Sequence, residues 1–380
     1  MNALGDARRP FVFVIPYDLD GEDLILIQPI GSNHPVADPH EMAPHGAAPT
    51  AGTDSRPTAC PQVPLYYHMP GAEQLPDNVP ALPENVQWQP EPPSFAEYQR
   101  AFETVQHHLH RGNSYLINLC FATPVSCNLS LEQMFSLARA PYKLLVPGRF
   151  ACFSPEPFVH LEDNRICTFP MKGTVRHAEE VPRLLADIKE QREHATVVDL
   201  LRNDLAIVGF GVEVERYRYV EQIQTQRGEL FATSSAISAS LPAHWPSRLG
   251  DIMLSLLPAG SVTGAPKTWT CRAIAEAEPV PRGYYTGVFG YFDGARLRSA
   301  VSIRFIEQQN EGHFLYRSGG GITTLSRAED EYRELCDKVY LPFPLAKPPV
   351  SGDPQGAAFG TVPSSTSPSG CPPSNRPRPQ

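Results

Sequence analysis

The sequence predicts an α+β fold with largely antiparallel sheets. Short apolar runs of strand type, separated by turn residues, alternate with amphipathic helical stretches, and these segments follow one another without regular βαβ spacing. The 380 residues can bury a large core in one large domain or two ordinary ones. A hydrophobic share of 41% with 19% charged residues is typical of a globular protein.

The N-terminal part predicts one hairpin followed by a long loop. Residues 11–15 and 24–27 are apolar and flank a polar turn at 18–23, which is the pattern of a strand–turn–strand hairpin. Residues 31–92 are rich in Pro, Ala, Gly and His and show little periodicity. Most of this stretch is therefore predicted to be a surface loop.

The central part predicts two capped helices and a series of strands. Ser94 and Glu97 form a capping box, and apolar residues at spacings of three and four continue to about Gly112. Ser130 and Gln133 open a second capped helix. Strands are expected at 115–121, 143–146, 150–153, 158–161 and 166–169.

The C-terminal half continues the same alternation and ends in a polar tail. Beyond Leu345 the chain is rich in Pro, Ser and Gly and has few apolar residues to bury, which predicts disorder. We therefore expect a hairpin and loop at 1–92, the main folded domain at 93–345 and a disordered tail at 346–380. Further helices are expected at 181–201, 247–257 and 267–277 and from Arg327, and further strands near 212–226, 229–240, 284–292, 296–306 and 313–318.

Bulk properties exclude several classes of function. The net charge of −9 argues against non-specific binding to nucleic acid. The apolar runs are too short to cross a bilayer, and the first ten residues contain no apolar segment of a secretion signal. The eight cysteines show neither a CxxC pair nor a zinc spacing. The sequence thus predicts a cytoplasmic protein without nucleic-acid or membrane partners.

Residues 260–267, Gly-Ser-Val-Thr-Gly-Ala-Pro-Lys, form the first motif with possible chemistry. Its small residues let the backbone approach a ligand, and its N–H groups can face an anion at the start of the next helix. The spacing to Lys267 differs from that of a P-loop. Taken alone, the motif is more typical of an ordinary structured turn.

Three glutamates are candidate metal ligands. Glu331 and Glu334 share one face of a helix, where their carboxylates repel each other unless a cation joins them. Carboxylates with substrate oxygens and water suit Mg²⁺ better than zinc. Glu193, at the start of a polar stretch in an otherwise apolar helix, is the third candidate. A solvated helix face with a Glu334–Lys338 pair is the more usual interpretation of the first two.

A glutamate and a lysine at strand ends are candidate catalytic residues. Glu156 follows Ser-Pro, and sixteen residues beyond Glu156 comes Lys172, the third residue of Pro-Met-Lys-Gly-Thr. A lysine beside glycine at the end of a strand can project into a cleft, and a desolvated lysine amine can act as a nucleophile. A single Lys or Glu is more often a surface charge.

Together and in this order, the motifs resemble those of the chorismate-utilising enzymes, which include anthranilate synthase component I, aminodeoxychorismate synthase component I, isochorismate synthase and salicylate synthase. The resemblance covers roughly residues 93–345. It implies one chorismate-binding domain, an α/β/β/α sandwich of two largely antiparallel sheets with the helices outside. The matching segments are NSYLINL at 113–119, VDLLRNDL, GSVTGAPK, residues 282–290, GGGI and EYRE.

Two positions distinguish the subfamilies. Lys172 lies where aminodeoxychorismate synthases have the lysine of PIKGT and anthranilate synthases typically have alanine. Isochorismate and salicylate synthases place a water-activating lysine where this chain has Leu116. The resemblance therefore implies amination of chorismate to 4-amino-4-deoxychorismate, a precursor of 4-aminobenzoate and folate.

The resemblance also implies a role for each candidate residue. Glu156 would protonate the departing hydroxyl at ring carbon 4, and Lys172 would attack carbon 2 before ammonia displaces it. Mg²⁺, held by Glu193, Glu331 and Glu334, would bind a substrate carboxylate. The substrate carboxylates would be held by Tyr285, Arg304, Thr263, Gly264, Gly320, Gly321 and Lys338.

The sequence also bears on the source of ammonia and leaves two alternative functions open. No region resembles a class I glutaminase, so the expected partner is a separate glutamine amidotransferase subunit, with free ammonia as the other source. Phe305 follows Arg304 where the family usually has Thr, a departure that bears on how the arginine is held. The alternatives are an anthranilate synthase component I and a non-catalytic chorismate-binding subunit.

Overall fold

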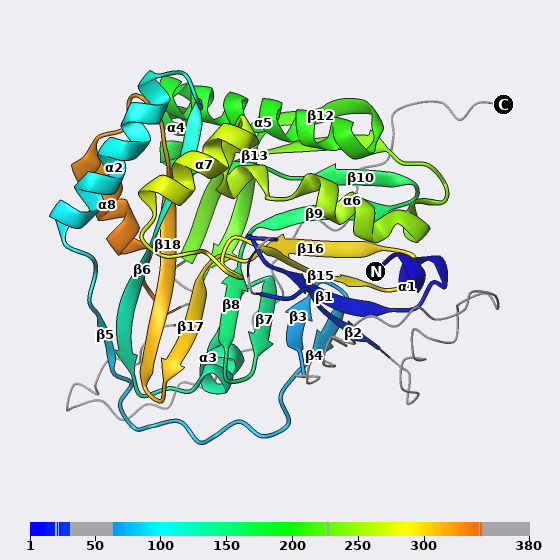
Figure 1. Ribbon diagram of the computed structural model, residues 1–380, viewed down its shortest axis with the longest axis horizontal. Coiled ribbons are helices and arrows are strands. Elements are labelled where there is room, and N and C mark those ends of the chain that lie inside the picture. Colours follow the sequence, from blue (N-terminus) through cyan, green and yellow to red (C-terminus); the bar gives the residue numbers. More distant parts are fainter. Residues whose placement is uncertain (20, 22, 31–63, 226–227, 342, 344–380) are drawn as a thin grey trace, which may run out of the picture.

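A computed structural model describes residues 1–19, 21, 23–30, 64–225, 228–341 and 343 (Figure 1). Two large sheets pack face to face and helices cover their outer faces, so the predicted α/β/β/α sandwich is confirmed. The pairings between the strands within each described sheet are antiparallel, as predicted. No helix in the described ranges is long and apolar enough to span a membrane.

The first sheet has nine strands and joins the N-terminal strands to strands from the second half of the chain. The N-terminal hairpin is part of it, because Phe11–Ile15 pairs along its whole length with Val288–Phe292. In spatial order the strands are β11 (Met171–Val175), β13 (Gly228–Ser240), β10 (Arg165–Thr168), β9 (Pro157–Glu162), β16 (Leu297–Val301), β15 (Val288–Phe292), β1 (Phe11–Ile15) and β2 (Leu26–Pro29), with β12 (Phe210–Thr225) also on β13.

The second sheet also has nine strands and carries the Gly-rich motifs. Its long central pair joins β6 to β18, so that Gly320 lies opposite Leu119 and Gly321 opposite Asn118. In spatial order the strands are β14 (Gly264–Ala265), β6 (Leu116–Cys127), β18 (His313–Ile322), β17 (Phe305–Asn310), β8 (Phe150–Ser154), β7 (Tyr142–Val146), β3 (Tyr66–Met69) and β4 (Ala72–Gln74), with β5 (Trp88–Pro90) also on β6.

Helices flank the two sheets, and apolar side chains fill each layer boundary. One apolar cluster lies between the first sheet and helices α5 and α6, a second lies between the sheets, and two more join the second sheet to α3 and to α2, α7 and α8. The helices are α1 (Asn2–Asp6), α2 (Phe95–His110), α3 (Leu131–Leu137), α4 (Val181–Ala186), α5 (Ile188–Val208), α6 (Leu249–Leu256), α7 (Lys267–Ala277) and α8 (Ala328–Asp337), with 3₁₀ turns η2 (Ala178–Glu180), η3 (Trp245–Arg248) and η4 (Gly260–Val262).

Local signals placed most elements correctly. Both capping boxes are present, with Ser94 accepting from Glu97 N and Ser130 accepting from Gln133 N. The helix predicted at 181–201 is instead two helices, because the side chain of Asp187 accepts from two backbone N–H groups and caps α5, which then runs on to Val208.

One strand prediction was wrong, and the stretch predicted to be mostly loop contains three short strands that the sequence did not indicate. Part of the predicted loop at 31–92 forms β3, β4 and β5, short strands that gain their hydrogen bonds from β7 and β6 and show no long periodicity of their own. The single strand predicted at 296–306 is broken: β16 lies in the first sheet and β17 in the second, and Arg304 turns between them with φ of 53°. Residues 31–63 and the predicted tail at 346–380 lie outside the described residues.

Candidate active site

The GSVTGAPK motif forms a tight loop against the start of β6. Gly264 has φ of +129°, and a Cβ there would lie 1.8 Å from the carbonyl oxygen of Leu116, so only glycine fits. The backbone N–H of Asn118 donates to the carbonyl oxygen of Thr263 at 2.9 Å. Lys267 at the loop's end donates to Asp204 of α5 at 2.8 Å. The motif is thus held to both a strand and a helix.

Replacing Gly264 with alanine is expected to lower the free energy of unfolding by about 3 kcal/mol or more, because the new Cβ collides with backbone that cannot move alone. Gly71→Ala is the matched control: Gly71 also has positive φ, +89°, but a Cβ there meets nothing within 4 Å. The control should cost only about 1–2 kcal/mol. Urea unfolding of both variants measures the difference, and equal losses would contradict the close contact.

Lys172 reaches from the first sheet to the glycines of the second. It lies at a bulge in β11, and its Nζ is 3.4 Å from Oε2 of Glu193 on α5. A Cβ on Gly321 would lie 3.7 Å from this Nζ and 3.1 Å from Cδ1 of Leu116. Lys172 and Leu116 therefore approach the same glycine, and the absence of a side chain at Gly321 leaves room between them.

Helix α8 presents two glutamates beside these glycines. Glu331 is 8% exposed, and a Cβ on Gly320 would lie 3.7 Å from its Oε2. Burial raises the pKa of Glu331, and the negative charges of Glu334 and Glu193 add to this effect. The three predicted metal ligands are therefore electrostatic neighbours, although they come from two helices far apart in the sequence.

Lysine side chains form ion pairs with two of these carboxylates, Glu334 and Glu193. Lys338 lies 2.7 Å from Oε1 of Glu334 and also donates to the carbonyl oxygen of Gly319 at 2.8 Å. Burial acts to raise the pKa of Glu334, but the ion pair with Lys338 and the charges of Lys172 and Lys189 together outweigh it and lower that pKa. Glu193 contacts Lys172 and, at 3.8 Å, Lys189.

The donor set fits magnesium in its chemistry. The three glutamates offer only hard carboxylate oxygens, which Mg²⁺ prefers over the softer ligands that zinc takes. Within the described residues, no group of three Asp, Glu, His or Cys side chains is already arranged to hold a metal ion. The carboxylates are held by ammonium groups instead, so metal binding requires Glu193 and Glu334 to exchange these partners.

Glu156 lies in the connection between β8 and β9. The Ser261 hydroxyl donates to its Oε1 at 2.6 Å. Burial raises the pKa of Glu156, against the opposing effect of this hydrogen bond. The positive charges of Lys172, Arg304 and Lys338 also act to lower this pKa, but burial is the largest effect. A buried carboxyl with a raised pKa is suited to donate a proton to a leaving group.

Arg304 is held by a residue that the sequence did not identify. Its Nε donates to the hydroxyl of Tyr340 at 3.1 Å, and its guanidinium carbon lies 5.7 Å from the centre of that ring. Phe305, where the family usually has Thr, packs instead on Phe150 with ring centres 4.7 Å apart and on Tyr285 at 6.0 Å.

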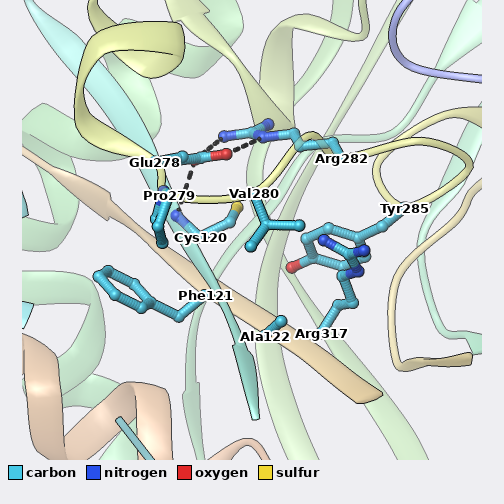
Figure 2. A pocket seen from close by; sticks show the side chains of 9 residues that line it. All are labelled: Cys120, Phe121, Ala122, Glu278, Pro279, Val280, Arg282, Tyr285 and Arg317. Carbon is cyan, nitrogen blue, oxygen red and sulfur yellow. Dashed lines mark hydrogen bonds and ion pairs between the residues drawn. The ribbon is translucent and has the colours of Figure 1, made fainter. Parts of the chain in front are cut away.

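Tyr285 lines a small pocket beside this cluster (Figure 2). The pocket has about 10 Å³ of space, enough for roughly one water molecule. Beside it, the buried Arg282 pairs with Glu278 at 2.6 Å and donates to the carbonyl oxygens of Val262 and Asn118, each at 2.7 Å. The other predicted site residues do not line this pocket.

The structure thus brings most predicted residues into two adjoining groups. The first joins Lys172 and Lys338 to the three glutamates and to Gly320 and Gly321. The second centres on Glu156, with Arg304 nearby. Thr263 and Gly264 brace the loop that carries Ser261. Sequence reasoning missed Ser261 and Tyr340; the first lies inside a motif that was already a candidate, whereas no local pattern indicates the second.

Comparisons with known proteins give the following matches. The family model for chorismate binding enzymes matches residues 56–343. The chain is 54% identical over 354 residues to an uncharacterized PabA-like protein of Pasteurella multocida, covering 90% of this chain and 96% of that protein. It is 31% identical over 260 residues to aminodeoxychorismate synthase component 1 of Klebsiella aerogenes, covering 64% of this chain and 56% of that protein.

Two solved structures are similar in fold. Anthranilate synthase component I from Streptococcus pneumoniae matches with a TM-score of 0.55 and 25% identity, over 67% of this chain and 59% of that one. A putative 2,3-dihydroxybenzoate-specific isochorismate synthase from Bacillus anthracis matches with a TM-score of 0.62 and 19% identity, over 89% of this chain and 86% of that one. The second match bears on the fold alone.

Proposed function

The chain belongs to the chorismate-binding enzymes, and from this premise we propose that it aminates chorismate at ring carbon 4 to give 4-amino-4-deoxychorismate. The observation that carries the proposal is the position of Lys172. Its amine lies beside Gly321 and Glu193, while the neighbouring Leu116 is apolar and cannot activate water. The site therefore offers a nitrogen nucleophile and lacks a base for water at the Leu116 position.

The reaction is proposed to proceed in two displacements. Lys172 first releases the proton of its ammonium form to the solvent. Its neutral amine then forms a bond to ring carbon 2, the ring double bond shifts, and the hydroxyl at carbon 4 leaves as water with a proton from Glu156. Ammonia then forms a bond to carbon 4, the double bond shifts back, and the lysine amine leaves carbon 2. Glu156 recovers a proton from the incoming ammonia.

The surrounding groups are proposed to hold the substrate's two carboxylates. Glu193, Glu331 and Glu334 would hold Mg²⁺, which when bound supplies a Lewis acid for one carboxylate. The planar guanidinium of Arg304 suits a carboxylate geometrically. Tyr285, Thr263, Gly264, Gly320, Gly321 and Lys338 are the further candidates for carboxylate contacts.

Ammonia is proposed to come from a partner glutamine amidotransferase. The Klebsiella aerogenes relative is named as component 1 of its synthase, which supports a second component here. This chain spans just over half of that relative, so activity and partner are carried over only as proposals. Ammonium salt should replace the partner in a purified assay.

The test is an assay of purified protein with chorismate, MgCl₂ and ammonium chloride, with the product identified by mass spectrometry. Amination alone gives a product that retains the enolpyruvyl group, so no pyruvate is released. An anthranilate synthase would release pyruvate, and a non-catalytic binding subunit would leave chorismate unconsumed. Either of these results would overturn the proposal.

A further inference from the structure

The hydrogen bond between Ser261 and Glu156 gives Ser261 a role that the sequence did not predict. It determines the orientation of the Glu156 carboxyl, the proposed general acid. The backbone of Glu156 is fixed on both sides: its N–H donates to the Ser154 hydroxyl at 3.1 Å, and its carbonyl oxygen accepts from Val301 N at 3.1 Å. With the backbone fixed, the carboxyl group can still rotate. The Ser261 hydroxyl, 2.6 Å from Oε1, restricts that rotation.

Ser261 is itself fixed by the loop around it. The Thr263 hydroxyl donates to the carbonyl oxygen of Ala259 at 2.8 Å, which closes the 3₁₀ turn η4. Buried Arg282 donates to the carbonyl oxygen of Val262, the residue after Ser261, at 2.7 Å. Lys267 ties the end of the loop to Asp204. The serine therefore approaches Glu156 from a braced backbone.

The Ser261 hydroxyl contacts one of the two carboxyl oxygens of Glu156, and this has a consequence for how the acid meets a substrate. The Ser261 hydroxyl lies on Oε1, so it sets which oxygen of the carboxyl faces the loop and which faces away from it. No other hydrogen bond to the Glu156 carboxyl occurs within the described ranges, so Oε2 remains available to a substrate. A carboxyl held by one of its oxygens is oriented before the substrate arrives.

We propose that Ser261 is a positioning residue, which holds the Glu156 carboxyl by Oε1 so that Oε2 faces the reacting substrate. The proposal deepens the amination proposed above and rests on it for the catalytic consequence. The charged groups facing this carboxyl are Lys172 from β11, Arg304 from the turn between β16 and β17, and Lys338 from the end of α8. Ser261 is the group that contacts it by a hydrogen bond.

The first arm of the test needs no activity. Infrared difference spectroscopy follows the carboxyl C=O band of Glu156 during a pH titration, with Glu156→Gln used to assign the band. In Ser261→Ala the pKa of Glu156 should rise by about one unit, because the carboxylate loses a donor, and the C=O band should shift to higher frequency. Ser261→Thr keeps the hydroxyl and should restore both. An unchanged band and pKa in Ser261→Ala would overturn the proposal.

The second arm measures amination with ammonium chloride. Ser261→Ala should lose about tenfold or more in kcat while KM for chorismate changes less than about threefold, because the proton donor and not substrate binding is impaired. Ser261→Thr should recover most of the rate. If the wild-type protein consumes no chorismate, the proposed function fails while the infrared arm still decides the role of Ser261. Normal kcat in Ser261→Ala, with active wild type, would refute the positioning role.

Discussion

Replacing Lys172 with alanine is expected to lower kcat for amination by about 10³-fold or more. The lysine is proposed to form the covalent bond that divides one difficult displacement into two easier ones, and alanine offers no nucleophile in its place. The position is half-buried beside Glu193 and Gly321, so the loss is chemical and should leave the fold intact. Product formation followed by mass spectrometry, with circular dichroism for the fold, measures the effect.

Lys189→Ala is the matched control for Lys172. Lys189 also places an ammonium near Glu193, at 3.8 Å, but its side chain is 55% exposed and has no proposed role in the reaction. Its removal should change kcat by less than about threefold. A wild-type adduct on Lys172, trapped with chorismate in the absence of ammonia and located by peptide mass, would add direct support. Unchanged amination by Lys172→Ala would rule out the covalent route.

Replacing Glu331 with glutamine is expected to remove magnesium activation and to lower kcat by about 10²-fold or more. The substitution keeps the shape of the side chain and removes one anionic oxygen ligand from a set of three. Calorimetric titration with MgCl₂ provides a readout independent of activity: wild type should bind the ion and the variant should bind it far more weakly. Wild-type affinity in Glu331→Gln would contradict the assignment.

The pKa of Glu331 gives this prediction a second consequence. Because burial raises that pKa in the folded protein, the unfolded chain ionises more readily, and the buried carboxylate costs stability at pH values above its folded pKa. Glu331→Gln should therefore be at least as stable as wild type at neutral pH. Glu329→Gln, exposed on the same helix, is the control and should alter neither magnesium binding nor stability. Magnesium binding should weaken on acidification, as Glu331 takes up its proton.

Much of the fold could be predicted because its signals are local. The capping boxes at Ser94 and Ser130 depend on residues three positions apart, and both are present. The strands β3, β4 and β5 could not be predicted, because their hydrogen bonds come from partner strands with which they share no local pattern. The break before Arg304 was missed for a similar reason: residues 296–306 are compatible with one strand, and only packing divides them between two sheets.

The candidate site shows the same division. The types of side chain that carry the proposed chemistry, including the lysine of PMKGT and the Glu331–Glu334 pair, can be read from the sequence. Their partners cannot: Ser261 lies 105 residues from Glu156 in the chain, and Tyr340 lies 36 residues from Arg304. Both contacts hold a candidate residue in place, and neither partner is distinguished by its local sequence.

The sequence by itself determined most of the helices and strands, the family resemblance and the kinds of functional group available. Only the tertiary structure decided that Lys172 crosses from one sheet to Gly321 of the other, and that Ser261 rather than a charged residue forms the hydrogen bond to the Glu156 carboxyl. The physical reason is that periodicity and capping act over a few residues. Distances between remote side chains are set by how two nine-stranded sheets and their helices pack.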